Sequence, residues 1–531
     1  MAHSIKTVYV VHHSHTDIGY TDLQERVIAI QVNYIKTVLS MMRQPEYADF
    51  RWNCETLYCV EEFWKQASED DRADFARFVK EGKIGISANY LNFNDLVNAD
   101  VFGKRLAKWQ DKLQPFGTKI RTAMAADVNG FSMGYRDAMI ENGVEFFFTN
   151  VHCHHGMYPL YQNQNAFFWE NASGQRLLVW NGEHYNLGNV LGLQPNHAVI
   201  WMMRNRLGED ADAGTSFSDQ LHTNLDKYTR HCYMGAEEVR DIVNDYDPVT
   251  YRLPYEVENK FFRICYKPGD GITSFVDKRT GTEMAGTAIP FFTPVYQRTP
   301  LHQEVPFSSY EERRALGRNI RGKHAETHIG KLMEITCMEH GPVFTQLRLH
   351  YSLAGTVKAD VLLKLYEAIP RIDFTLELGK TISDEVESVF LSLDLNRPGN
   401  GTVLRKGARE AFRPGIDQLP GTCMEFYMSD DGAARLSPEG SVLIAARDVP
   451  MFYTGEMQHH PIRLCDGAAE NNARPLYSWV MNNNWETNFK MDLSGFCQYD
   501  YSLWLTNISD PEQAMDELHE QLFDPYVLIV R

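Results

Sequence analysis

The chain has 531 residues, of which 44% are apolar, and this length allows two or three domains that each bury a core. The formal net charge of −18 argues against nucleic acid or an anionic membrane as a partner. No apolar run approaches the roughly 20 residues of a membrane span. The first apolar run begins too close to Met1 for a signal peptide, so we expect a cytoplasmic protein. Nine cysteines occur without any Cys-x-x-Cys pair, which predicts neither a disulfide framework nor a structural zinc site.

Short apolar runs alternate with helical patterns through the first part of the chain. Repeats of strand and helix predict an α/β domain with a mostly parallel sheet. We expect strands at residues 8–11, 50–53, 84–88, 122–126, 145–149 and 177–180, and two of the helices at 70–80 and 101–114. This α/β pattern ends near Leu193.

From about Tyr251 the pattern changes to short segments in which polar and apolar residues alternate. Examples lie at 343–351, 371–378 and 388–395, separated by turns that contain Gly, Pro and Asn. This pattern is typical of stacked antiparallel sheets. We therefore divide the chain into an α/β domain at 1–195, a helical segment at 196–247 and a β-sandwich domain at 248–531.

A cluster of potential metal ligands, His13-Ser-His15-Thr-Asp17, follows the first apolar run. Because side chains alternate between the two faces of a strand, His13, His15 and Asp17 would point the same way. Two imidazoles and a carboxylate are ligands suited to zinc or a similar divalent ion. The alternative is that these polar residues only cap the strand, with each imidazole satisfied by hydrogen bonds. Three potential ligands in alternation favour the metal site.

A second candidate, Asp127, follows the expected strand at 122–126. Active-site groups gather at the carboxyl ends of the strands in α/β sheets and barrels, so Asp127 would share one mouth with His15 and Asp17. A lone aspartate ahead of Asn129-Gly130 is more often a turn residue, and this alternative stays open.

Taken in order, these motifs resemble those of glycoside hydrolase family 38, the metal-dependent α-mannosidases. Residues 13–20, HSHTDIGY, are similar to the family's HSHxDxGW-like motif, with Tyr20 in place of tryptophan. Residues 126–132, ADVNGFS, look like a variant of its xDxFGxS motif. Between them lie further similarities at Trp52 with Glu55, at 78–86 and at Asn94-Asp95. The resemblance covers residues 5–190 and 250–531.

The resemblance implies a retaining glycoside hydrolase that acts on α-mannosides or related α-glycosides with zinc or another divalent metal. It makes His15 and Asp17 metal ligands, and Asp127 both a ligand and the nucleophile. It also implies a barrel-like catalytic domain of seven strands, complete or incomplete, before the helical segment and the β-sandwich. Homo-oligomers are common among such enzymes, so we expect one here.

Between residues 185 and 247 the chain looks shortened, because the family carries the rest of its barrel, a general acid and a last histidine ligand there. His231 is the candidate for this fourth ligand, and the alternative is that it lies on a solvated helix face. The general acid has no match. Glu183 and Asp95 are the nearest candidates by their positions at expected strand ends.

Two further polar loops, at 150–156 and 181–185, follow the fifth and sixth expected strands. Imidazole, amide and aromatic groups suit a sugar, which needs directional hydrogen bonds and an apolar platform; the alternative is ordinary surface polarity. The residues that we expect to bind substrate are His13, Tyr20, Glu55, Asp95, His152, His154, His155, Glu183, His184 and Tyr185.

Two other functions remain open at this stage. Metal-dependent amidohydrolases also begin with two histidines on a first strand, and His152 or His154 with His184 would supply their later ligands. The large β domain argues against this class. The third interpretation is a shortened homologue that binds carbohydrate without turnover.

Overall fold

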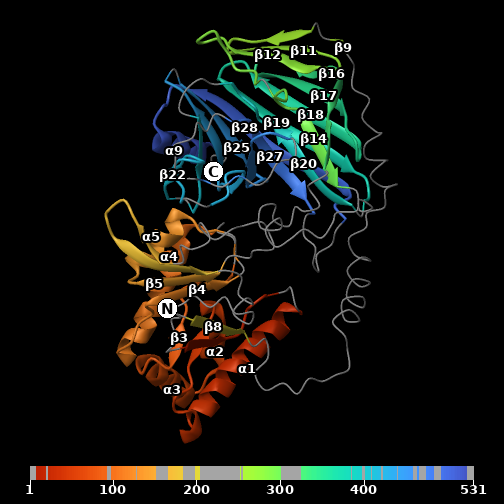
Figure 1. Ribbon diagram of the computed structural model, residues 1–531. Helices are drawn as coiled ribbons and strands as arrows, with labels where there is room; N and C mark the ends of the chain where they lie inside the picture. The colour runs from red at the N-terminus through yellow and green to blue at the C-terminus, as the bar shows by residue number, and fades with distance from the viewer. Residues whose placement is uncertain are drawn as a thin grey trace, which may run out of the picture. The chain divides into compact units, whose positions relative to one another are not determined.

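The computed structural model describes residues 8–18, 22–92, 97–126, 128, 130–150, 166–182, 198–203, 251–252, 255–286, 288–299, 325–383, 385–396, 401–407, 409–419, 422–438, 440–457, 463, 465, 474–483 and 492–522 (Figure 1). The chain forms two compact units. Unit 1 comprises Met1–Thr215 and Lys406–Arg409, and unit 2 comprises Ser216–Arg405 and Glu410–Arg531. The short segment Lys406–Arg409 thus belongs to unit 1 although the chain on either side of it belongs to unit 2.

Unit 1 alternates strands with helices, as the sequence predicts. Its strands are β1 (Val8–His13), β2 (Trp52–Cys54), β3 (Ile84–Ile86), β4 (Thr122–Ala126), β5 (Phe146–Asn150), β6 (Ala166–Glu170), β7 (Arg176–Gly182) and β8 (Ala198–Met203). Its α-helices are α1 (Gln24–Met42), α2 (Leu57–Gln66), α3 (Glu69–Lys80), α4 (Ala99–Leu113) and α5 (Met133–Glu141), with short 3₁₀ helices η1 (Pro45–Tyr47) and η2 (Gln114–Phe116). All six predicted strands and both predicted helices are present.

The strands of unit 1 form two four-stranded sheets with the orders β3-β2-β1-β8 and β4-β5-β7-β6. Every pairing is parallel except that of β6 with β7. A single parallel bridge between Ser87 and Thr122 joins β3 to β4, so the two sheets continue one another. Among the described residues a closed barrel of seven strands is not confirmed.

The sequence pattern predicts a helical segment at residues 196–247, but this segment is not helical throughout. Ala198–Met203 form β8, which pairs with β1 in parallel over its whole length, from Val8 with Ala198 to His13 with Met203. The stretch AVIWMM is apolar at every position, which is typical of a strand inside a parallel sheet. It therefore extends the α/β unit beyond the predicted end at residue 195. The rest of this segment lies outside the described residues.

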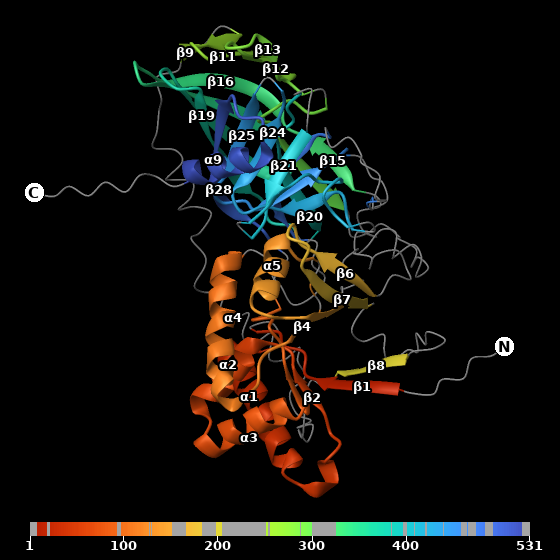
Figure 2. The ribbon, with the colours of Figure 1, turned by 90° about the vertical axis from the view of Figure 1, so that its left-hand side faces the viewer.

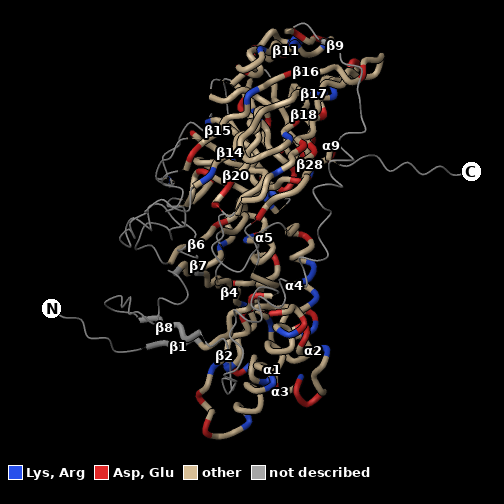
Figure 3. Tube along the Cα trace, turned by 90° about the vertical axis from the view of Figure 1, so that its right-hand side faces the viewer, with Lys and Arg blue, Asp and Glu red and all other residues tan. Residues whose placement is uncertain are grey.

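One apolar core holds the helices of unit 1 against its sheets. It contains the buried side chains of Val38 from α1, Phe63 from α2, Phe75 from α3, Leu106 from α4 and Met139 from α5. Three of the helices begin at side chains that accept hydrogen bonds from the first turn, namely Ser68, Asn98 and Ser132. The helices of unit 1 also carry charged residues of both signs, which appear as red and blue segments of the tube (Figure 3).

Unit 2 is built almost entirely of antiparallel strands: β9 (Tyr251–Arg252), β10 (Glu256–Glu258), β11 (Phe262–Lys267), β12 (Gly271–Asp277), β13 (Thr282–Glu283), β14 (Pro294–Thr299), β15 (Glu326–Ile329), β16 (Lys331–His340), β17 (Phe344–Ser352), β18 (Thr356–Tyr366), β19 (Arg371–Lys380), β20 (Val386–Ser392), β21 (Gly401–Arg405), β22 (Ala411–Phe412), β23 (Phe426–Met428), β24 (Gly432–Leu436), β25 (Ser441–Ala446), β26 (Met451–Thr454), β27 (Leu476–Asn482) and β28 (Gly495–Thr506). They form a ten-stranded sheet, a six-stranded sheet and a four-stranded sheet. The predicted sheet-rich region is confirmed.

The core of unit 2 lies between these sheets. Phe374 and Tyr501 of the ten-stranded sheet, Leu391 of the six-stranded sheet and Phe275 of the four-stranded sheet belong to one buried cluster. The helix α9 (Pro511–Leu522) packs against the ten-stranded sheet through Met515, in a separate cluster with side chains of β21, β24, β25 and β28 (Figure 2).

The structure describes seven of the cysteines, and no disulfide joins any two of them. No helix in the described ranges is both long enough and apolar enough to cross a bilayer.

A buried serine replaces backbone pairing where the two sheets of unit 1 meet. The Ser87 hydroxyl accepts a hydrogen bond from the Met124 amide (2.8 Å) and donates to the Met124 carbonyl (3.0 Å). It also accepts from the Asn89 amide at 3.1 Å. Ser87 is completely buried, so removing the hydroxyl leaves these groups without a partner.

We therefore expect Ser87→Ala to lower the free energy of unfolding by about 2–3 kcal/mol, since each unsatisfied buried group costs about 1–3 kcal/mol. Chemical denaturation of the purified chain measures the change. Ser40→Ala, on the exposed face of α1, is the matched control and should change the free energy by less than about 0.5 kcal/mol. Equal losses in the two variants would contradict a special role for Ser87.

Candidate functional site

The candidate site lies at the carboxyl ends of β1, β2 and β3. His13 at the end of β1 pairs with Asn53 of β2, which in turn pairs with Gly85 of β3. Because these strands are parallel and in register, the residues that follow each of them leave the sheet at the same edge. His15 and Asp17 follow β1, Glu55 follows β2, and Asn89 and Asn92 follow β3.

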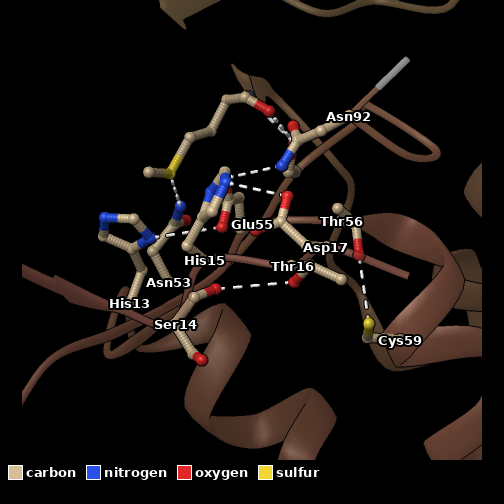
Figure 4. A network of polar contacts seen from close by, with 12 residues as sticks. His13, Ser14, His15, Thr16, Asp17, Asn53, Glu55, Thr56, Cys59 and Asn92 are labelled. Carbon is tan, nitrogen blue, oxygen red and sulfur yellow. Dashed lines mark hydrogen bonds and ion pairs between the residues drawn. The ribbon is translucent and has the colours of Figure 1, made fainter. Parts of the chain in front are cut away.

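A buried carboxylate, Glu55, joins the two histidines (Figure 4). The Nδ1 atom of His15 lies 2.9 Å from Glu55 Oε1, and the Nδ1 atom of His13 lies 3.4 Å from Oε2. The side-chain amide of Asn92 donates a further hydrogen bond to Oε1 at 2.7 Å. The side chains of His13 and Glu55 are 0% exposed and that of His15 is 3% exposed, so water does not compete for these contacts.

The second nitrogen of His15 faces a different carboxylate. Its Nε2 atom lies 3.2 Å from Oδ1 of Asp17, whose side chain is 27% exposed. His15 therefore bridges a fully buried carboxylate on one side and a partly open one on the other. The open end of this arrangement is at Asp17, where a small ligand would reach it.

The neighbouring groups of this cluster shift the pKa values of His15 and Glu55 so that both side chains are charged. Burial disfavours the charged form of His15, but Glu55 and Asp17 outweigh it and raise the pKa of His15 to about 10. Burial likewise opposes ionisation of Glu55, but His15 and His13 lower its pKa to about 2. In the metal-free protein at neutral pH, Glu55 is thus a carboxylate and His15 an imidazolium.

Hydrogen bonds from helix α1 hold the loop that follows β1. The Gln31 side chain of α1 donates one hydrogen bond to the Ser14 hydroxyl (3.2 Å) and one to the His15 carbonyl (3.1 Å). At the start of α2, the hydroxyl of the N-cap residue Thr56 donates a hydrogen bond to the Cys59 sulfur at 3.1 Å. Burial raises the pKa of the Cys59 thiol to about 11, so it stays protonated near neutrality and is a poor metal ligand there.

Comparison with known proteins gives a family match for the first part of the chain. Residues 6–247 match the sequence profile described as the glycosyl hydrolases family 38 N-terminal domain. Residues 6–247 therefore belong to glycosyl hydrolase family 38, as its N-terminal domain. No curated protein matches the chain in sequence.

Two solved structures share the fold of this family 38 chain. One is an α-mannosidase from Enterococcus faecalis V583, with a TM-score of 0.59 and 10% identity, over 97% of this chain and 89% of that one. The other is a glycosyl hydrolase family 38 protein from Enterococcus faecalis, with a TM-score of 0.57 and 9% identity, over 97% and 88% of the two chains. Family membership supports a glycosidase and disfavours the amidohydrolase interpretation.

The separation of the His15 and Asp17 side chains fits two ligands of one zinc ion. Two ligand atoms that each lie about 2.1 Å from one tetrahedral zinc are about 3.4 Å apart, close to the 3.2 Å between His15 Nε2 and Asp17 Oδ1. Metal-binding histidines commonly donate their other ring N–H to a carboxylate, as His15 does to Glu55. Among the described residues, no group of three or more His, Cys, Asp or Glu side chains could hold a metal ion.

The structure brings together four of the residues singled out by sequence: His13, His15, Asp17 and Glu55. Glu55 is buried between the two histidines, so its place differs from that expected of a residue that touches substrate. The other predicted site residues lie outside the described residues; these are Tyr20, Asp95, Asp127, His152, His154, His155, Glu183, His184, Tyr185 and His231.

Sequence reasoning missed three polar residues that complete the cluster, Gln31, Asn89 and Asn92. Asn89 and Asn92 follow β3 at the same sheet edge as His15 and Asp17. Two asparagines after a predicted parallel strand were a usable signal. Gln31 gave none, because a glutamine on an amphipathic helix is ordinarily solvated.

Proposed function

We propose that this family 38 protein is a retaining, metal-assisted glycoside hydrolase that acts on α-mannosides or related α-glycosides. The observation that carries the proposal is the His15 ring, held by Glu55 at Nδ1 and turned with Nε2 toward Asp17. His15, Asp17 and Asp127 would hold zinc or another divalent ion, with His231 as the further ligand. When bound, the ion supplies Lewis-acid character and a template for neighbouring sugar hydroxyls.

The protein's own groups then divide the work of two displacements. The Asp127 carboxylate attacks the anomeric carbon while the bond to the leaving oxygen breaks, and a general acid gives that oxygen a proton. In the second step the same group, now a base, takes a proton from water as water displaces Asp127. Glu183 and Asp95 are the candidates for this acid. The buried Glu55 orients the histidines and keeps water from their inner side.

Further expectations belong to this proposal. Tyr20, His152, His154, His155, His184 and Tyr185 would contact the sugar, and His13 would close the inner wall of the site. We also propose a cytoplasmic location, a barrel-like catalytic domain and a homo-oligomer. The family carries a longer segment where this chain has residues 185–247, so turnover is the property that most needs a direct test.

The test combines metal content with hydrolysis of an aryl α-mannoside. We expect about one zinc or similar ion per chain, and cleavage that stops on chelation and returns when zinc is added. Asp127→Asn should lower cleavage by several orders of magnitude while zinc stays bound through the remaining ligands. Asp49→Asn, at an exposed position ahead of β2, is the matched control and should cleave as the wild type does.

Two results would count against the proposal. Cleavage that survives Asp127→Asn would show that the nucleophile is wrong. Bound metal and bound mannoside without any cleavage would favour the carbohydrate-binding homologue instead of an enzyme.

A further inference from the structure

A chain of side-chain hydrogen bonds runs from helix α5 to the candidate site. The Tyr135 hydroxyl of α5 donates to Oδ1 of Asn89 at 3.0 Å. The side-chain amide of Asn89 donates to Oδ1 of Asn92 at 3.1 Å. The amide of Asn92 donates to Glu55 Oε1, which is also the atom that His15 Nδ1 contacts. Four consecutive hydrogen bonds therefore connect Tyr135 with His15.

The first three of these bonds point in one direction, from Tyr135 toward Glu55. Each asparagine accepts through its oxygen on the side of Tyr135 and donates through its nitrogen on the side of Glu55. A carboxylate only accepts, so the order in the chain ends at Glu55 with His15 Nδ1–H as the remaining donor. Because Nδ1 of His15 is bonded to Glu55, Nε2 is the nitrogen that faces Asp17.

The middle of the chain is rigidly placed. The Asn89 amide donates to the Ser87 hydroxyl at 3.1 Å, and its carbonyl accepts from the Leu57 amide at the start of α2, at 2.8 Å. Asn89 and Tyr135 are each 2% exposed, and Glu55 is 3% exposed. Each asparagine of the network both accepts and donates a side-chain hydrogen bond, so turning either amide over would replace its bonds with unfavourable contacts.

The far end of the chain of bonds lies on the helix that follows β4 in the sequence. Helix α5 begins at Met133, and the hydroxyl of its N-cap residue Ser132 accepts from the Tyr135 amide at 3.0 Å. The Tyr135 ring stacks on Phe102 and Phe131. Tyr135 is therefore fixed by packing as well as by hydrogen bonds, and it ties the residues after β1, β2 and β3 to the helix that follows β4.

We propose that Asn92, Asn89 and Tyr135 are positioning residues that set the orientation of Glu55 and, through it, the His15 ring for metal binding. The inference rests on the proposed function, because it needs His15 to be a metal ligand. These three residues touch neither metal nor substrate. They act through Glu55, in the way that residues that hydrogen-bond to a metal ligand commonly orient it.

Zinc affinity of the metal-free chain, measured by competition with a chromogenic chelator, tests this role. We expect Asn92→Leu and Tyr135→Phe each to weaken zinc binding about 10-fold, within the range for partners behind a ligand. Because both belong to one chain of bonds, the double variant should bind about as weakly as Asn92→Leu alone. Tyr90→Phe is the control: Tyr90 follows Asn89 in the sequence, but its hydroxyl accepts a hydrogen bond from Arg105 and is not part of the chain of bonds.

A spectroscopic readout separates positioning from general damage to the fold. In the zinc-loaded protein labelled with ¹⁵N-histidine, the proton on His15 Nδ1 that bonds to Glu55 should give a downfield resonance. We expect this resonance to move or broaden in Asn92→Leu and to stay unchanged in Tyr90→Phe. Thermal unfolding of the zinc-free variants shows whether affinity merely follows stability.

The outcomes distinguish the two ideas. If the wild type binds zinc and both variants bind it equally well, the positioning role is overturned while the metal site stands. If the two single losses add fully in the double variant, the residues do not act as one chain, which also overturns the inference. If the wild type binds no zinc, the proposed function itself fails.

Discussion

His15→Ala is expected to weaken zinc binding by more than about 100-fold. Losing a residue that hydrogen-bonds to a metal ligand costs about 10–100-fold in affinity, and losing the ligand itself should cost more. The His15 side chain supplies the nitrogen that faces Asp17 at 3.2 Å. The neighbouring His13 does not replace it, since His13 contacts the other oxygen of Glu55 and its side chain is fully buried. Isothermal titration of the metal-free chain with zinc measures the change.

The matched control for this experiment is His12→Ala. His12 lies on the same strand, but its ring stacks on Phe50 at 4.9 Å and its Nδ1 contacts the Arg51 carbonyl. The control removes an imidazole three residues away without touching the site, so its zinc affinity should equal that of the wild type. If the two variants bind zinc equally, His15 is not a ligand.

Loss of His15 also has a consequence for the metal-free fold. Glu55 would keep its buried charge and lose its nearest partner, and removing one partner of a buried ion pair costs about 3–5 kcal/mol. His15→Ala should therefore unfold earlier than His12→Ala even without zinc. Comparing both variants with and without zinc separates this loss from the loss of metal binding.

How far the sequence leads is clearest at β1. Alternation along the strand predicts that His13, His15 and Asp17 point the same way. In the structure β1 ends at His13, and the residues after it are not part of a strand. The histidines nevertheless converge, because both contact Glu55 from the end of β2. The sequence predicts that these side chains lie together, but the cause of their convergence in the structure is a tertiary contact.

The features that the sequence did not predict share a physical cause. β8 becomes part of the sheet only through its pairing with β1, almost two hundred residues earlier in the chain. The Asn89–Asn92 bond matters only because β2 and β3 lie in register, which places Glu55 beside the residues after β3. Strand order and register are long-range properties, and local periodicity does not contain them. The six strands predicted from local patterns were all found.

A large effect on stability is also expected in unit 2, at a buried ion pair. Lys380 Nζ at the end of β19 lies 2.7 Å from Glu387 Oε1 of β20, and the two side chains are 0% and 1% exposed. The Tyr296 hydroxyl also donates to Glu387, and burial together with that carboxylate raises the pKa of Tyr296, so it stays a donor. Lys380→Met leaves the Glu387 carboxylate buried without its cation.

We expect Lys380→Met to lower the free energy of unfolding by about 3–5 kcal/mol, the usual cost of removing one partner of a buried pair. The double variant Lys380→Met/Glu387→Leu should recover most of this loss, because it leaves no buried charge behind. Urea unfolding followed by circular dichroism measures both.

Lys358→Met is the control that isolates burial as the cause. Lys358 and Glu377 form an ion pair of the same length, 2.7 Å, between β18 and β19, but their side chains are 24% and 18% exposed. Water stabilises a charge left behind there, so this variant should lose no more than about 1 kcal/mol. Equal losses at the two sites would mean that distance alone decides the contribution of an ion pair in this sheet. A double variant no more stable than Lys380→Met would show that Glu387 is held by Tyr296 and its other neighbours rather than by the lysine.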